Sequence, residues 1–190
     1  MGKNARRTRE DRRGTRYAKA FYTSVIVVVL IAAVAMMVFA QEDIKRSPGC
    51  KYCGMDREKF SQSRMHLVYD DGTTVGTCSL HCTALELAIA IDKIPAALQV
   101  ADYPSKKLID AEKAAWVIGG NKPGVMTRQA KWAFENKADA EKFIQESGGK
   151  LAAFDEAIKL SYEDMYLDAK MIREKRKMKK KADMEHGHQM

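Results

Sequence analysis

Four cysteines in two close pairs are the residues of this chain best suited to chemistry. Two residues separate Cys50 from Cys53, three separate Cys78 from Cys82, and 24 residues lie between the pairs. An Asp-Asp-Gly turn at 70–72, between two short strand-like runs, predicts a hairpin whose base brings Cys53 and Cys78 together. Because residues four apart lie on one face of a helix, Cys78 and Cys82 can face the same point. The spacing therefore predicts four thiolates that converge on one metal ion.

The cysteine spacing alone leaves the metal open. Structural Zn²⁺ favours four-cysteine tetrahedral sites of this kind, and an oxidising compartment would favour one or two disulfides instead. Two neighbouring residues favour a softer ion. Met55 offers a thioether, which suits Cu(I) better than Zn²⁺, and His81, beside Cys82, offers an imidazole. We favour Cu(I), with Zn²⁺ and disulfides as the alternatives.

The cysteines are positioned by a pattern of elements that occurs twice. Each unit is predicted to be a β-hairpin followed by a helix, and a longer C-terminal helix with apolar residues at three- and four-residue steps follows. This order predicts an α+β fold with internal structural duplication. The predicted strands are 65–69, 73–77, 115–119 and 131–135; the predicted helices are 83–92, 138–147 and the stretch from 155 onwards.

An uncharged, mostly apolar run at 21–40 precedes this α+β region. Twenty helical residues span about 30 Å, the thickness of the hydrocarbon core of a bilayer. The basic flank at 1–20 and the polar, acidic start of the linker at 41–49 orient the run with the N-terminus in the cytoplasm. We therefore predict an N-terminal transmembrane helix and a single-pass inner-membrane protein whose C-terminal domain lies in the periplasm. The alternative is a cleaved signal peptide, because Val38-Phe39-Ala40 fits a cleavage site.

The charge distribution argues against a nucleic-acid partner. Residues 1–20 and 173–181 each carry a net +6, whereas the whole chain carries +8, so the remainder is acidic and has no basic face for phosphates. No phosphate-binding loop or nucleophile elbow is present. A redox-active pair at Cys50 and Cys53, as in a thiol oxidoreductase, lacks the βαβ context that such a motif needs. We predict that the protein is not an enzyme.

The segment CKYCGM…VYDDGTTVGTCSLHC resembles the NosL family of copper-binding accessory proteins, and more broadly the treble-clef heavy-metal modules called TRASH or YHS. They share a Cys-Gly-Met knuckle, a hairpin and a Cys-Ser-x-x-Cys ending. The second half is similar to NosL in its Val-x-Gly strand, its Val-Met turn and its Gly-Gly-x4-Phe-x-Glu-Ala ending. The resemblance covers 50–158, and 159–190 is predicted to form a C-terminal helix and basic tail.

The resemblance implies a Cu(I) chaperone that serves nitrous-oxide reductase or a related exported copper enzyme. Cys53 and Met55 match the family's metal-associated Cys-Gly-Met, and Met126 falls in its Val-Met turn. The expected partners are the membrane and a recipient copper enzyme or its assembly factors. A structural zinc-knuckle or disulfide-stabilised interaction subunit tethered to the membrane is the alternative. The predicted metal ligands are Cys50, Cys53, Met55, Cys78, His81, Cys82 and Met126.

Overall fold

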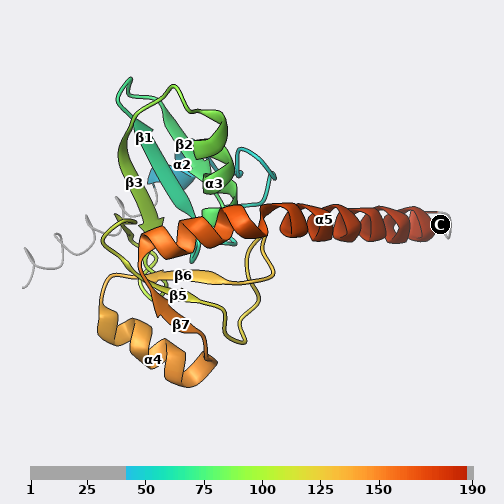
Figure 1. Cartoon of the computed structure of the whole chain (residues 1–190). Coiled ribbons are helices and arrows are strands. Elements are labelled where there is room, and N and C mark those ends of the chain that lie inside the picture. The colour runs from blue at the N-terminus through green and yellow to red at the C-terminus, as the bar shows by residue number, and fades with distance from the viewer. Residues whose placement is uncertain (1–41, 188–190) are drawn as a thin grey trace, which may run out of the picture. The chain divides into compact units, whose positions relative to one another are not determined.

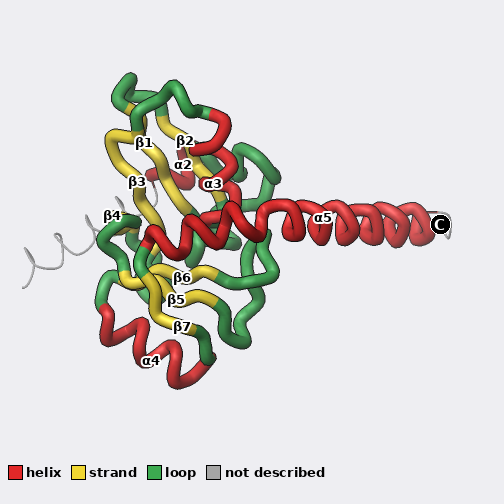
Figure 2. The backbone as a smooth tube through the Cα atoms, viewed as in Figure 1, coloured by secondary structure: helices red, strands yellow, loops and turns green. Residues whose placement is uncertain are grey.

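The computed structural model describes residues 42–187, which form an α+β fold with two antiparallel sheets (Figures 1 and 2). One sheet has the strand order β2-β1-β3-β4 and the other the order β6-β5-β7. The elements in chain order are α2 Glu42–Arg46, β1 Met65–Tyr69, β2 Thr74–Thr77, α3 Leu80–Ile89, β3 Pro95–Ala101, β4 Leu108–Asp110, β5 Ala115–Ile118, β6 Lys131–Phe134, α4 Lys137–Ser147, β7 Lys150–Ala152 and α5 Phe154–Gly187.

The hairpin of β1 and β2 forms because its turn residues suit the turn geometry and because β1 is buried along most of its length. Gly72 has a φ of 78°, which a glycine adopts without strain, and the Asp71 carboxylate accepts a hydrogen bond from the Thr73 amide at 2.8 Å. Met65 and Leu67 on β1 are both 0% exposed. The register pairs Met65 with Thr77, so the base of the hairpin lies beside Cys78.

The second sheet packs its apolar face into the same core as the cysteines. Trp132 and Phe134 of β6 belong with Phe143 of α4 to one buried cluster, and that cluster also contains Cys50, Cys78 and Cys82. α4 ends at Gly148, whose φ of 73° suits a glycine after a helix and whose amide donates to the Ile144 carbonyl. The two hairpin-plus-helix units therefore share a core, and the cysteines lie where they meet.

Helix α5 packs along α3 with its first half and continues beyond the rest of the described fold (Figure 1). Ala157, Ser161 and Asp168 are buried, whereas every residue of 173–184 is exposed. The predicted boundary between 50–158 and 159–190 falls inside this helix. Its first half belongs to the fold and its second half extends from it.

The structure corrects the predicted N-terminal transmembrane helix. The apolar run at 21–40 lies outside the described residues, and none of the helices within 42–187 combines the length and apolar character needed to cross a bilayer. α5 has 34 residues, but Lys, Arg, Asp and Glu recur along it, and such charges are costly in hydrocarbon. Two predictions are therefore wrong for the described structure. One is the spanning helix in the predicted fold class, and the other is the single-pass inner-membrane location with a periplasmic domain.

The predicted α+β order is confirmed, with additions. Both hairpins and all three predicted helices are present, and α3 begins at Leu80, three residues earlier than expected. The strands β3, β4 and β7 and the short helix α2, inside the predicted linker, were not expected. β3 pairs with β1, and β7 pairs with β5, so each widens a predicted hairpin into a sheet.

Candidate metal centre

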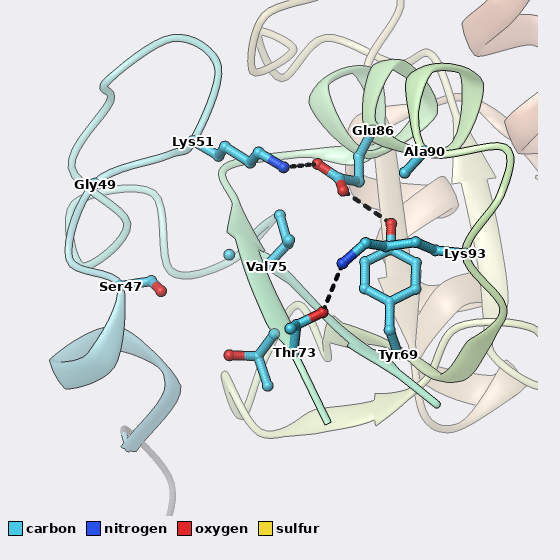
Figure 3. A pocket seen from close by; sticks show the side chains of 11 residues that line it. Ser47, Gly49, Lys51, Tyr69, Thr73, Val75, Glu86, Ala90 and Lys93 are labelled. Atoms are coloured by element: carbon cyan, nitrogen blue, oxygen red, sulfur yellow. Dashed lines mark hydrogen bonds and ion pairs between the residues drawn. The ribbon is translucent and has the colours of Figure 1, made fainter. Parts of the chain in front are cut away.

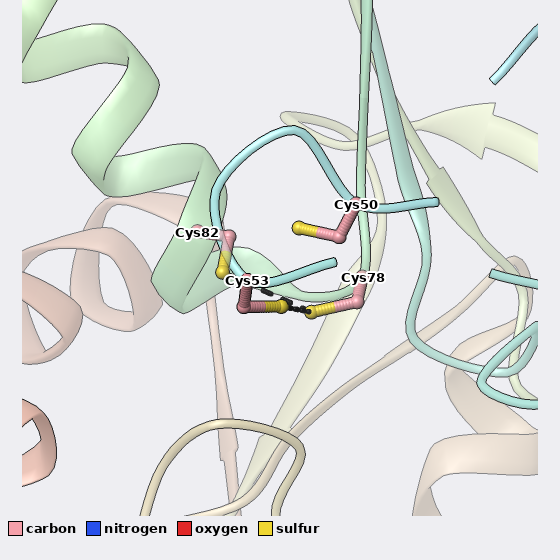
Figure 4. A group of neighbouring side chains, drawn as sticks. All are labelled: Cys50, Cys53, Cys78 and Cys82. Atoms are coloured by element: carbon pink, nitrogen blue, oxygen red, sulfur yellow. Dashed lines mark hydrogen bonds between the residues drawn. The ribbon is translucent and has the colours of Figure 1, made fainter. Parts of the chain in front are cut away.

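The four cysteine sulfurs converge on one point (Figure 4). All four Sγ atoms lie within 4.8 Å of one another, Cys53 lies 3.4 Å from Cys78, and Cys78 lies 3.8 Å from Cys82. All are free thiols. Four sulfurs bound at about 2.3 Å to a tetrahedral ion would lie about 3.8 Å apart. The four cysteine sulfurs therefore have the spacing of a metal centre.

The first cysteine pair is positioned by a tight loop. The Cys50 amide donates to the Met55 carbonyl at 2.8 Å, and the Gly54 amide donates to the Cys50 carbonyl at 2.9 Å. Gly54 has a φ of 72°, a conformation that favours glycine, so it allows the chain to turn back after Cys53. The Lys51 amide donates to the Gly76 carbonyl at 3.1 Å, which attaches the loop to β2.

The second pair is positioned where β2 gives way to α3. Cys78 directly follows the strand, Ser79 is the N-cap residue, and Cys82 lies in the first turn of the helix. The Cys78 carbonyl accepts a hydrogen bond from the Ser63 hydroxyl at 2.8 Å. The end of β2 and the first turn of α3 thus fix Cys78 and Cys82 more firmly than the loop fixes Cys53.

Burial divides the four thiols into three protected groups and one accessible group. Cys50, Cys78 and Cys82 are 4%, 0% and 1% exposed, whereas Cys53 is partly exposed. The Arg176 guanidinium of α5 donates to the Cys53 carbonyl at 3.1 Å, so this helix passes beside the exposed side of the centre. A ligand-exchange partner would reach Cys53 first.

The thiols interact strongly with one another. The pKa of Cys50 is lowered because Cys53, Cys78 and Cys82 can donate hydrogen bonds to its thiolate. The pKa values of Cys78 and Cys82 are raised, because their protons are held by these thiolates and because both are buried. If all four thiols lost their protons, the neighbouring thiolates would repel one another. A bound cation would offset that repulsion, and its binding would displace the protons.

The two predicted methionine ligands lie beside the same core. Met55 and Met126 are partly buried and pack against the cluster that contains Cys50, Cys78 and Cys82. Met126 has a φ of 61°, which is uncommon for a residue with a side chain. Both side chains therefore contact the core in which three of the thiols are buried, and their role as ligands stays a prediction.

The structure does not bring His81 to the thiols. Adjacent residues on a helix point about 100° apart, so the side chain after Leu80 leaves α3 on a different face from Cys82. His81 Nδ1 lies 3.5 Å from the Asp168 carboxylate of α5, and the side chain is buried. The pKa of His81 is lowered chiefly by burial, which the Asp168 charge partly opposes.

Glu86 is a residue of this region that was not predicted from the sequence. It is 1% exposed on α3, one turn beyond Cys82, and its carboxylate accepts hydrogen bonds from the loop between Cys50 and Cys53. A carboxylate on the same helical face as Cys82, with apolar residues on both sides of it in the run ALELAIAI, was the available signal.

The fold and the site define a class: a small α+β protein with a thiol-rich centre suited to a soft metal ion. The chain belongs to the NosL family, whose model matches residues 41–161. Among solved structures it is similar to the copper chaperone NosL from Shewanella denitrificans, with 25% identity and a TM-score of 0.46, over 58% of this chain and 89% of that chain. The search of curated protein sequences returned no match. The predicted NosL resemblance is confirmed, and with it the expectation of a non-enzymatic protein.

Proposed function

We propose that this protein is a copper chaperone that holds Cu(I) at the cysteine centre and passes it to a recipient copper protein. Membership in the NosL family supports this proposal. The observation that carries it is the convergence of four thiols, three buried and one partly exposed. Thiolate and thioether sulfur are the protein ligands that Cu(I) prefers.

The chemistry of such a carrier is ligand exchange at a partly open site. Cys53 is the thiol that an incoming sulfur ligand of the recipient reaches, while Cys78 and Cys82 stay fixed by β2 and α3. The cargo is then shared between the two proteins before it leaves. As an extension that rests on the family alone, we propose nitrous-oxide reductase or one of its assembly factors as the recipient.

The test is a Cu(I) titration of the reduced protein under anaerobic conditions against a competing chelator. We expect one Cu(I) per chain, and an affinity that falls on the order of a hundredfold in Cys53→Ser, or about 2.7 kcal/mol. Met55→Leu and Met126→Leu are expected to weaken Cu(I) binding but not the fold. Met178→Leu, at a methionine that is 62% exposed on α5, is the matched control. An unchanged affinity for Cu(I) in both Cys53→Ser and Met55→Leu would contradict the proposal.

A second candidate function is a structural zinc centre in an interaction protein. The burial of three of the four thiols favours it, because structural zinc sites are closed. It predicts zinc in the purified protein, unfolding when a chelator removes the metal, and no effect of Met55→Leu on metal affinity. Elemental analysis of protein purified under reducing, anaerobic conditions, followed by chelation, separates the two functions.

A further inference from the structure

Glu86 on α3 has a buried carboxylate that accepts three hydrogen bonds, two of which, from Lys51 and Tyr69, are drawn in Figure 3. Lys51 Nζ lies 2.8 Å and the Tyr52 hydroxyl 2.5 Å from its Oε2 atom. The Tyr69 hydroxyl donates to Oε1 at 2.9 Å. Although burial alone would raise the pKa of Glu86, these three donors lower it, so the carboxylate is an ionised acceptor.

The three donors come from two different parts of the fold. Lys51 and Tyr52 are the two residues between Cys50 and Cys53, so they belong to the loop that carries half of the thiols. Tyr69 is 2% exposed at the end of β1 and is fixed by the sheet. Glu86 itself is on the helix that carries Cys82. The carboxylate therefore ties the loop that carries Cys50 and Cys53 to the helix that carries Cys82 and to β1.

The two contacts to the loop differ in strength. The side chain of Lys51 is 51% exposed, and an ion pair with such a partner contributes little. Tyr52 is partly buried, and its hydroxyl makes a short, charge-assisted hydrogen bond to a carboxylate that is 1% exposed. Burial, followed by the hydrogen bond to Glu86, raises the pKa of Tyr52, so the phenol keeps the proton that it donates. Tyr52 is the main link.

We propose that Glu86 is a positioning residue that fastens the Cys50–Cys53 loop to α3 and thereby sets how fast the cysteine centre releases its metal. This inference rests on the proposed carrier function. Release needs Cys53, and then Cys50, to move away from Cys78 and Cys82. The loop keeps the hydrogen bond from the Lys51 amide to the Gly76 carbonyl, so loss of the Tyr52 contact removes one of its attachments and leaves Gly49 and Gly54 as its flexible ends.

Two tyrosine variants that each remove one hydroxyl from the same carboxylate provide the test. Tyr52→Phe cuts the link to the loop, and Tyr69→Phe, the matched control, cuts the link to the sheet. The rate of Cu(I) removal by excess bicinchoninate is followed by stopped-flow absorbance. We expect removal to be about tenfold faster in Tyr52→Phe, the size expected for one lost hydrogen bond to a charged group. Tyr69→Phe is expected to stay within about twofold of the unaltered protein.

If Glu86 only stabilised the fold, the rate of Cu(I) removal would change in both tyrosine variants, in proportion to their losses in thermal stability. Equal removal rates in Tyr52→Phe and Tyr69→Phe, or no change in either, would overturn the proposal. Glu86→Gln, which keeps the size but removes the charge, is expected to follow Tyr52→Phe.

A second readout does not need copper. Cys50 is 4% exposed, so its alkylation by iodoacetamide in the metal-free protein reports on loop opening. Mass spectrometry should show faster alkylation of Cys50 in Tyr52→Phe than in Tyr69→Phe, and equal rates contradict the proposal. If the unaltered protein binds no Cu(I), the carrier function fails, and the alkylation rates still decide the role of Glu86.

Discussion

At the scale of single residues, a buried arginine joins α2 and the segment that follows it to the β1–β2 hairpin. Arg57 is 0% exposed, and its guanidinium pairs with the Asp43 carboxylate at 2.7 Å. It also donates to the carbonyls of Asp43, Ser47, Met65 and Thr77. A buried charge is tolerated only when its hydrogen bonds are made, so the backbone around Arg57 is arranged to supply acceptors.

Gly76 on β2 is the position where this arrangement is most sensitive. A Cβ atom there would lie 2.5 Å from Arg57 Nη1 and 2.6 Å from its Cζ atom. Because Arg57 cannot move without losing several hydrogen bonds, we expect Gly76→Ala to lower the free energy of unfolding by about 2–4 kcal/mol. Urea unfolding of the metal-free protein measures this. Gly49→Ala is the control, since the nearest atom to its Cβ is 3.8 Å away. Equal losses in the two variants would contradict the argument.

The cysteine spacing in the sequence predicted the cluster of thiols but not the residues that position it. Two cysteine pairs separated by a hairpin predicted that the four sulfurs converge, and in the structure they lie within 4.8 Å of one another. His81 was favoured for its chemistry and its neighbour in the sequence, yet helical geometry directs it to α5. Glu86 could not be assigned, because its partners lie 17 to 35 residues away and belong to other elements. Such contacts depend on tertiary structure, which a local pattern does not contain.

At the scale of elements, the strongly patterned ones were predictable and the short ones were not. The hairpin of β1 and β2 has an Asp-Gly turn, and α3 and α4 have helical spacing. By contrast, β3 begins at Pro95 and its burial follows a gradient along the strand rather than alternation. β4 and β7 have only three residues each. These strands exist because a neighbouring strand offers unpaired backbone groups, so the sheet specifies them more than their own residues do.

The contact between α3 and α5 gives the protein a pH-dependent stability. His81 and Asp168 are buried, and burial lowers the pKa of His81 below its ordinary value of 6.5. The folded state therefore binds protons less readily than the unfolded chain does. The free energy of unfolding is therefore not reduced by His81 above about pH 6.5, and it falls as the pH drops below that value, because the unfolded chain then takes up the proton. His66 on β1 is buried as well, its pKa is also lowered, and it acts in the same direction.

We therefore expect the free energy of unfolding of the metal-free protein to fall between pH 7.5 and pH 5.5. The fall should be smaller in His81→Gln, because the variant has no group at this position that gains a proton on unfolding. His66→Gln should reduce the fall independently, since the two histidines are on different elements. Urea unfolding at the two pH values checks both expectations. An unaltered pH dependence in His81→Gln would show that the imidazole is protonated equally in both states.

At the scale of the whole molecule, the second half of α5 is a basic extension beyond the family match, which ends at residue 161. All residues of 173–184 are exposed, so burial contributes little to holding this segment in a helix, although Arg176 donates its hydrogen bond to the Cys53 carbonyl. Its residues are mostly good helix formers, Lys, Arg, Met and Ala. Like charges four residues apart nevertheless oppose the helix. The pairs are Arg173–Lys177, Lys175–Lys179, Arg176–Lys180 and Lys177–Lys181.

Salt should therefore strengthen this helix, because it screens repulsion between exposed charges. We expect the helical circular-dichroism signal at 222 nm to rise between 10 mM and 500 mM NaCl. Lys177→Glu turns two repulsive pairs, with Arg173 and Lys181, into attractive ones, a change of about 1 kcal/mol in favour of the helix. This variant should show more helix at low salt and a smaller response to salt. A chain that ends at Ile172 lacks the segment and should respond little. An equal response in the full and shortened chains would mean that the repelling charges are not what limits the helix.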